Sequence, residues 1–91
     1  MNTNVKGEKL EGLVIRSIPD GDCDLVHDIL KEFRVCINWR LKKGSQHHYG
    51  PTVIVTGTKN EISKVKERFK LRHSYGSDMK TLYVYKGIKE S

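Results

Sequence analysis

The residues that could do chemistry in this chain are cations and tyrosines at every second position of short β-rich runs. Arg40 and Lys42 alternate with apolar residues, Tyr83 and Tyr85 alternate near the C-terminus, and Arg16 ends a run of aliphatic residues. Alternate side chains of a strand share one face, so these runs would place cations and rings on one flat surface. Rings stack on unpaired bases while cations bind phosphates, so the pattern favours RNA or single-stranded nucleic acid.

Composition is typical of one small globular domain with acidic partners. The 91 residues are 36% hydrophobic and 31% charged, with a formal net charge of +6. Such an excess favours nucleic acid, an anionic membrane surface or an acidic protein. The chain contains no apolar run of about 20 residues and no signal-peptide pattern, so we expect a cytoplasmic protein without a membrane segment. We expect Cys23 and Cys36 to be buried, reduced thiols.

The elements that would position the cations and tyrosines follow from hydrophobic periodicity and turn residues. We expect flexible tails at residues 1–9 and 89–91 around a single α+β domain at residues 10–88. Asp20 and Asp22 would cap the first helix, and the Thr58 to Glu61 spacing predicts a capping box for the second. The predicted elements are a strand at 12–18, a helix to about 34, strands at 35–42 and 52–56, a helix from 58 to about 73, and a strand at 81–85.

This order predicts a ferredoxin-like βαββαβ two-layer sandwich. Its four-stranded antiparallel sheet would have the order 4-1-3-2. Right-handed crossovers would place both helices on one face of the sheet, and the opposite face would stay open to solvent or to a partner.

Alternation then assigns the side chains of each predicted strand to one of the two faces. The face toward the helices would carry Leu13, Ile15, Ile37, Trp39, Leu41, Val53, Val55, Leu82 and Val84. The open face would carry Val14, Arg16, Asn38, Arg40, Lys42, Thr52, Ile54, Thr56, Tyr83 and Tyr85.

A polar hairpin tip between Gly44 and Gly50 extends this candidate surface. It brings Lys43, His47 and His48 close to Lys42, where they could reach a phosphate backbone, although an exposed loop would be polar in any case. The predicted nucleic-acid-binding residues, with the cations on phosphates and the tyrosines stacking on bases, are Arg16, Arg40, Lys42, Lys43, His48, Tyr83 and Tyr85.

Two RNA-binding families provide points of comparison. The predicted architecture resembles that of the RNA-recognition motif, but Val14 stands where its first strand has an aromatic residue, and Thr52 to Val55 lack interleaved aromatics. The segment from Ile62 to Leu82 resembles the basic helix, glycine turn and strand of the SUI1 translation-initiation fold, whereas the residues before 35 do not fit it. The first similarity covers architecture only, and the second covers composition.

No motif predicts catalysis, a cofactor or a metal site. The loop after the first strand, Pro19 to Asp22, is acidic where an acylphosphatase would bind phosphate, and Cys23 lacks the second cysteine of a heavy-metal site. His47 and His48 are adjacent and would point apart on an extended segment. The alternative function is that of a small accessory protein, which would bind an acidic protein or form a homodimer through an edge strand or the open sheet face.

Overall fold

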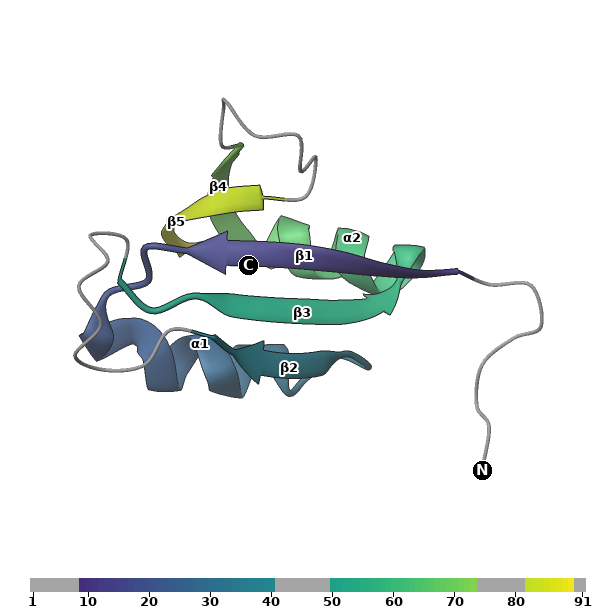
Figure 1. The fold of residues 1–91 in the computed structure, drawn as a ribbon, viewed down its shortest axis with the longest axis horizontal. Helices are drawn as coiled ribbons and strands as arrows, with labels where there is room; N and C mark the ends of the chain where they lie inside the picture. The colour runs from purple at the N-terminus through teal and green to yellow at the C-terminus, as the bar shows by residue number, and fades with distance from the viewer. Residues whose placement is uncertain (1–8, 41–49, 74–81, 90–91) are drawn as a thin grey trace.

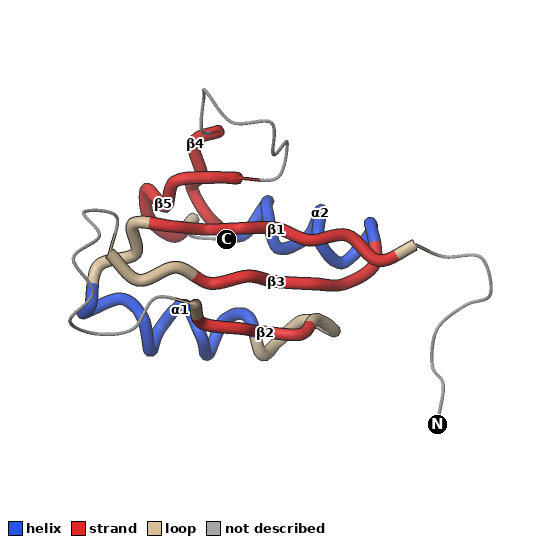
Figure 2. The backbone as a smooth tube through the Cα atoms, in the orientation of Figure 1, coloured by secondary structure: helices blue, strands red, loops and turns tan. Residues whose placement is uncertain are grey.

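The computed structural model describes residues 9–40, 50–73 and 82–89, and the fold is an α+β sandwich with one mixed sheet (Figures 1 and 2). Its elements in chain order are β1 (Leu10–Arg16), the short 3-10 helix η1 (Asp20–Asp22), α1 (Cys23–Leu30), β2 (Cys36–Trp39), β3 (Val53–Thr58), α2 (Lys59–Arg68), β4 (Phe69–His73) and β5 (Leu82–Ile88).

The ferredoxin-like prediction is wrong, because the sheet has five strands in the order β2-β3-β1-β5-β4. β1 and β3 pair in antiparallel fashion, as do β2 with β3 and β4 with β5, but β5 is parallel to β1. In the predicted fold the strand after the second helix would lie next to β1. In the structure the strand after α2 is β4, which lies at the edge of the sheet. β5 runs antiparallel to β4 and lies between β4 and β1.

The additional strand occupies the end of the predicted second helix. α2 stops at Arg68 and β4 begins at Phe69, whereas helical spacing from Ile62 and Val65 to Phe69 predicted a helix to about residue 73. Phe69 fits both periodicities, since Leu71 follows it at strand spacing. The pairing of β4 with β5 decides in favour of the strand, and Phe69 is buried at 1% exposure.

The hydrophobic core lies between the sheet and the two helices, which lie behind β1, β2 and β3 in Figure 1. The predicted inward faces of β1 and β3 are confirmed, because alternate residues of these strands are buried. Ile37 and Trp39 of β2 pack against the same cluster. The fully or almost fully buried aliphatic residues are Leu13, Ile15, Ile18, Val26, Ile29, Leu30, Val53, Val55, Ile62 and Val65.

At the start of α2, one of the two hydrogen bonds of the predicted capping box is present. Thr58 Oγ1 accepts a hydrogen bond from the Glu61 backbone N–H at 3.3 Å. The Glu61 carboxylate does not complete the box in the described contacts, because it accepts from the Arg34 backbone N–H at 3.2 Å and from Lys64 Nζ at 3.3 Å. Glu61 therefore ties α2 to the connection between α1 and β2.

Gly57 of β3 marks a close approach to the same connection. It is buried, and a Cβ atom there would lie 2.8 Å from Val35 Cγ1 and 3.3 Å from the Arg34 carbonyl oxygen. Glycine is needed because the chain after α1 packs directly on the β3 backbone. None of the helices in the described ranges is long and apolar enough to cross a membrane.

Candidate nucleic-acid interface

Three arginines form a row across the uncovered face of the sheet. Arg72 of β4 and Arg16 of β1 both lie opposite Val84 of β5. On the other side of β1, Val53 of β3 pairs with both Ile15 and Trp39, which directly precede Arg16 and Arg40. Continuing this register by one residue brings Arg16 and Arg40 to either side of Thr52, whose carbonyl oxygen accepts a hydrogen bond from the Arg40 backbone N–H at 2.7 Å. Residues opposite one another share a face, so Arg40, Arg16 and Arg72 form one transverse line, which we call the arginine row.

The arginine row runs the full width of the sheet. Arg40 and Arg72 are exposed at its two ends, and Arg16 is half-buried in the middle. Neighbouring strands lie about 4.8 Å apart, so the row spans about 19 Å over five strands. The sheet twists, and β4 runs across the direction of β1 in Figure 2, so the row follows a curved surface.

A second row of side chains lies beside the arginines on the open face. Leu82 of β5, Val14 of β1 and Ile54 of β3 are aligned by strand pairing, and Asn38 of β2 completes the row. The three apolar residues are half-buried and Asn38 is exposed. The open face therefore combines a cationic line with an apolar line that the helices do not cover.

Tyr85 does not lie on this face, so its predicted outward position is wrong. Its side chain is 7% exposed, its ring centroid lies 6.3 Å from that of Phe69, and its hydroxyl donates to Asp22 Oδ2 at 2.9 Å. Burial, with a smaller contribution from the Asp22 carboxylate, raises the pKa of Tyr85 to about 12. Tyr85 packs in the core instead of stacking on bases.

Tyr83 also lies on the helix side of the sheet. It is opposite the buried Ile15 in the parallel pairing of β5 with β1, so the two share a face. Lys66 Nζ lies 5.1 Å from the Tyr83 ring centroid, and the His73 ring makes an edge contact at 5.2 Å. Parallel pairing thus reverses the predicted faces of the last strand, and Leu82 and Val84 point to the open side.

The three remaining predicted residues, Lys42, Lys43 and His48, lie outside the described residues, as do His47 and Tyr49 of the hairpin tip. Of the seven predicted binding residues, the structure brings together Arg16 and Arg40, and it adds Arg72, which sequence reasoning placed in a helix. The alternation of Phe69, Leu71 and His73 is the sequence signal that could have revealed Arg72.

Two polar contacts in the core have no counterpart in the sequence predictions. Asp22 is the N-cap residue of α1 but makes no side-chain capping bond, and its carboxylate accepts from Tyr85 instead. Trp39 Nε1–H donates to His27 Nδ1 at 3.1 Å, which joins β2 to α1. The predicted burial of Cys36 is wrong, since this thiol is exposed, while Cys23 is half-buried.

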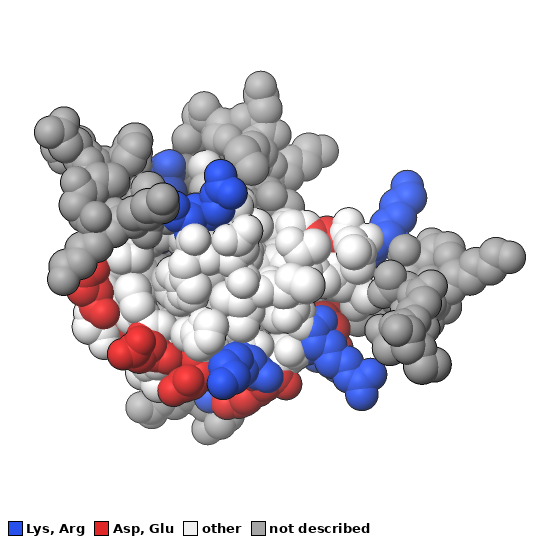
Figure 3. Space-filling view, turned by 60° about the horizontal axis from the view of Figure 1, so that its bottom comes forward, with Lys and Arg blue, Asp and Glu red and all other residues white. Residues whose placement is uncertain are grey.

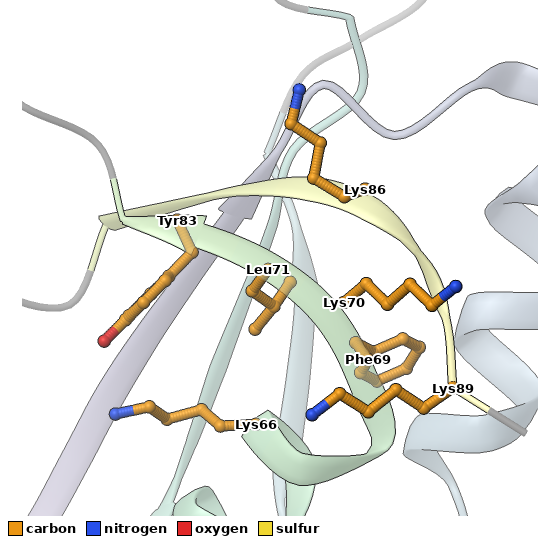
Figure 4. Close-up of a pocket in the computed structure, with 7 residues that line it drawn as sticks. All are labelled: Lys66, Phe69, Lys70, Leu71, Tyr83, Lys86 and Lys89. Carbon is orange, nitrogen blue, oxygen red and sulfur yellow. The ribbon is translucent and has the colours of Figure 1, made fainter.

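A pocket of about 430 Å³ lies where the end of α2 meets β4 and β5 (Figure 4). Phe69, Leu71 and Tyr83 supply its apolar surface, and four lysines surround them. We call this the lysine pocket, and its cations are Lys66, Lys70, Lys86 and Lys89. In Figure 4 the side chains of Lys66 and Lys89 run along the same side of the pocket, whereas Lys70 and Lys86 extend away from it.

Charge is distributed unevenly over the two helices and their neighbours. Residues 20–34 carry five acidic and two basic side chains, whereas residues 59–73 and 82–89 together carry two acidic and eight basic ones. Figure 3 shows acidic residues gathered along one side of the molecule. Within the described ranges, no group of three or more His, Cys, Asp or Glu side chains could hold a metal ion.

No family model matches this chain. No curated protein and no solved structure matches it either.

Proposed function

We propose that this chain is a small, non-catalytic nucleic-acid-binding domain that binds RNA or single-stranded nucleic acid on the open face of its sheet. The observation that carries this proposal is the arginine row of Arg40, Arg16 and Arg72. Guanidinium groups bind phosphates through charge-assisted, often bidentate hydrogen bonds, and a line of them suits an extended polyanion better than a compact ligand.

The neighbouring apolar row supports the same function. Val14, Ile54 and Leu82 offer flat, partly exposed contact surface beside the cations. Unpaired bases could pack there while their phosphates follow the arginines. No aromatic ring is placed among these rows, so we expect binding dominated by phosphate contacts, with weak preference among base sequences. We also propose a cytoplasmic location, as expected from the sequence.

The alternative function is that of an accessory protein that binds an acidic protein, and the uneven charge distribution is the observation that favours it. A basic surface around α2, β4 and β5 could dock on an acidic partner. The acidic residues around α1 could occupy that surface in a second copy of the chain, and β2 and β4 are edge strands available for pairing.

The affinity for RNA and its dependence on salt concentration separate the nucleic-acid-binding function from the accessory function. Each phosphate contact on a single strand contributes about 0.7 to the slope of log affinity against log salt, so the arginine row contributes about 2. Replacing the exposed pair, Arg40→Gln with Arg72→Gln, should lower the slope by about 1.4 in a fluorescence-anisotropy titration with mixed-sequence RNA.

The matched control replaces Lys31 and Lys59 with Gln, which removes the same charge from exposed positions outside the arginine row. The control should keep the slope of the unmodified chain. Equal losses in both variants would show that only net charge matters and would overturn the proposed role of the row. Retention of a protein partner after nuclease treatment, without RNA binding, would favour the accessory function.

A further inference from the structure

The lysine pocket lies on the opposite side of the β4–β5 hairpin from the arginine row. Leu71 contributes to the pocket, and Arg72 is the next residue on the same strand. Consecutive residues of a strand point to opposite faces, so β4 presents Arg72 to the open face and Leu71 to the pocket. Because β4 is an edge strand, one extended ligand could contact both faces by passing around it.

The charge of the pocket indicates an anionic ligand. None of its seven lining residues is acidic, and four of them are lysines. Lys66 and Lys89 lie along one side of the pocket, so an anion bound there would be attracted by both ammonium groups. Lys89 is well anchored for this role, because its backbone N–H donates to the Arg68 carbonyl oxygen at 3.0 Å and its own carbonyl oxygen accepts from Arg68 Nη1 at 2.7 Å.

The apolar surface of the pocket indicates that the anion also carries a flat organic group. Tyr83 and Leu71 are half-buried there, and Lys66 Nζ is already held over the Tyr83 ring at 5.1 Å. A volume of about 430 Å³ is within the range of ordinary ligand pockets. A pocket that combines these apolar side chains with ammonium groups matches a base with its phosphate, whereas an acidic peptide would leave Leu71 and the exposed part of Tyr83 uncovered.

We infer that the lysine pocket binds a nucleoside phosphate, with Lys66 and Lys89 on the phosphate and Tyr83 and Leu71 against the base. This nucleoside phosphate is either a free nucleotide or one nucleotide of the strand that the arginine row binds. The second possibility rests on the proposed function. A strand that uses both sites wraps around β4 and needs more nucleotides than the open face alone.

The test replaces Lys66 and Lys89 with Gln and measures affinity for oligonucleotides of about four and about twelve nucleotides, which fall within the range of known single-strand binding sites. With the longer oligonucleotide, affinity should fall about tenfold and the salt slope by about 0.7, since the one phosphate held by Lys66 and Lys89 is lost. With the shorter one, affinity should change little. The Lys31→Gln, Lys59→Gln variant is again the charge-matched control.

Nuclear magnetic resonance distinguishes the two sources of the ligand. Shifts of the Tyr83 and Lys66 resonances with adenosine monophosphate would support a free nucleotide, and shifts only with the longer oligonucleotide would support a unit of the strand. Poly-glutamate shifting these resonances while both nucleotide probes leave them unchanged would overturn the inference.

The two proposals can fail separately. If the Lys66, Lys89 variant matches its control at both lengths, and neither nucleotide probe shifts Tyr83, the pocket inference is wrong even if the arginine row binds. If the Arg40, Arg72 variant matches its control while the lysine variant weakens binding, the arginine-row proposal is wrong and the pocket inference stands.

Discussion

The segment around α1 and the corner formed by α2, β4 and β5 pack on the same core but have opposite surfaces. Residues 20–34 are predominantly acidic, and residues 59–73 with 82–89 are predominantly basic. An anionic ligand approaching the molecule would be repelled by the first region and attracted by the second, so the difference orients the encounter as well as strengthening it. Under the proposed function, this comparison favours binding at the corner of α2, β4 and β5, which holds the lysine pocket and Arg72, rather than around α1.

Tyr85 and Asp22 connect the two regions, and removing that connection should have the largest effect. Tyr85→Ala should lower the free energy of unfolding by about 3–5 kcal/mol, because a buried aromatic side chain leaves a cavity beside Phe69. Tyr85→Phe should cost about 1–2 kcal/mol, since it removes only the hydroxyl that donates to Asp22. Urea unfolding followed by circular dichroism measures both losses.

Tyr83→Phe is the matched control for Tyr85→Phe, because it removes a tyrosine hydroxyl from the same strand. The described contacts of Tyr83 with Lys66 and His73 are made through its ring, so this variant should unfold within about 0.5 kcal/mol of the unmodified chain. If Tyr83→Phe and Tyr85→Phe are equally destabilising, the bond to Asp22 does not stabilise the junction between the regions.

The same junction should respond to alkaline pH. The pKa of Tyr85 is raised from 10.0 to about 12 in the folded chain, chiefly by burial, so the folded state holds this proton more tightly than the unfolded state. Its contribution to stability is complete below pH 10 and is lost as pH rises toward about 12. Tyrosinate absorbance should show one late-titrating tyrosine that Tyr85→Phe removes, and its persistence in that variant would contradict the assignment.

The smallest expected effect concerns Glu61, a carboxylate on the basic side of the comparison. The Arg34 backbone N–H, with a smaller contribution from Lys64, lowers the pKa of Glu61 below 4.5, although partial desolvation opposes the shift. The ionised carboxylate therefore contributes stability above pH 4.5, which is lost as pH falls through the lowered pKa. Glu61→Gln should be slightly less stable than the unmodified chain near pH 7. The difference in stability between the two proteins should vanish in acid. A difference that stays constant with pH would show that ionisation of Glu61 does not cause it.

Apolar and polar residues alternate clearly in β2, and the faces of β1 and β3 were predicted from Arg16 in the first run and Thr52 and Thr56 in the second. Alternation failed at β5, where Leu82, Tyr83, Val84 and Tyr85 can all be buried, so no pattern within the segment selects a face. Only the pairing of Ile15 with Tyr83 settles the orientation, and this contact links residues far apart in the sequence.

The fold prediction failed for a related reason. Phe69 satisfies helical spacing from Val65 and strand spacing to Leu71, so local periodicity could not separate the end of α2 from β4. Without β4, Arg72 could not be placed on the sheet, and the lysine pocket could not be recognised. Arg16 and Arg40 could be predicted on the open face because each directly follows an apolar residue that faces the core, Ile15 and Trp39.

The central claim is that the position of the arginines, and not the overall charge, produces nucleic-acid binding. Its most direct test is the slope of log affinity against log salt for mixed-sequence RNA in three proteins: the unmodified chain, the Arg40→Gln, Arg72→Gln variant, and the Lys31→Gln, Lys59→Gln variant. A slope lowered by about 1.4 in the arginine variant alone is the predicted result. Equal slopes in the two variants, or no RNA binding by the unmodified chain, would contradict it.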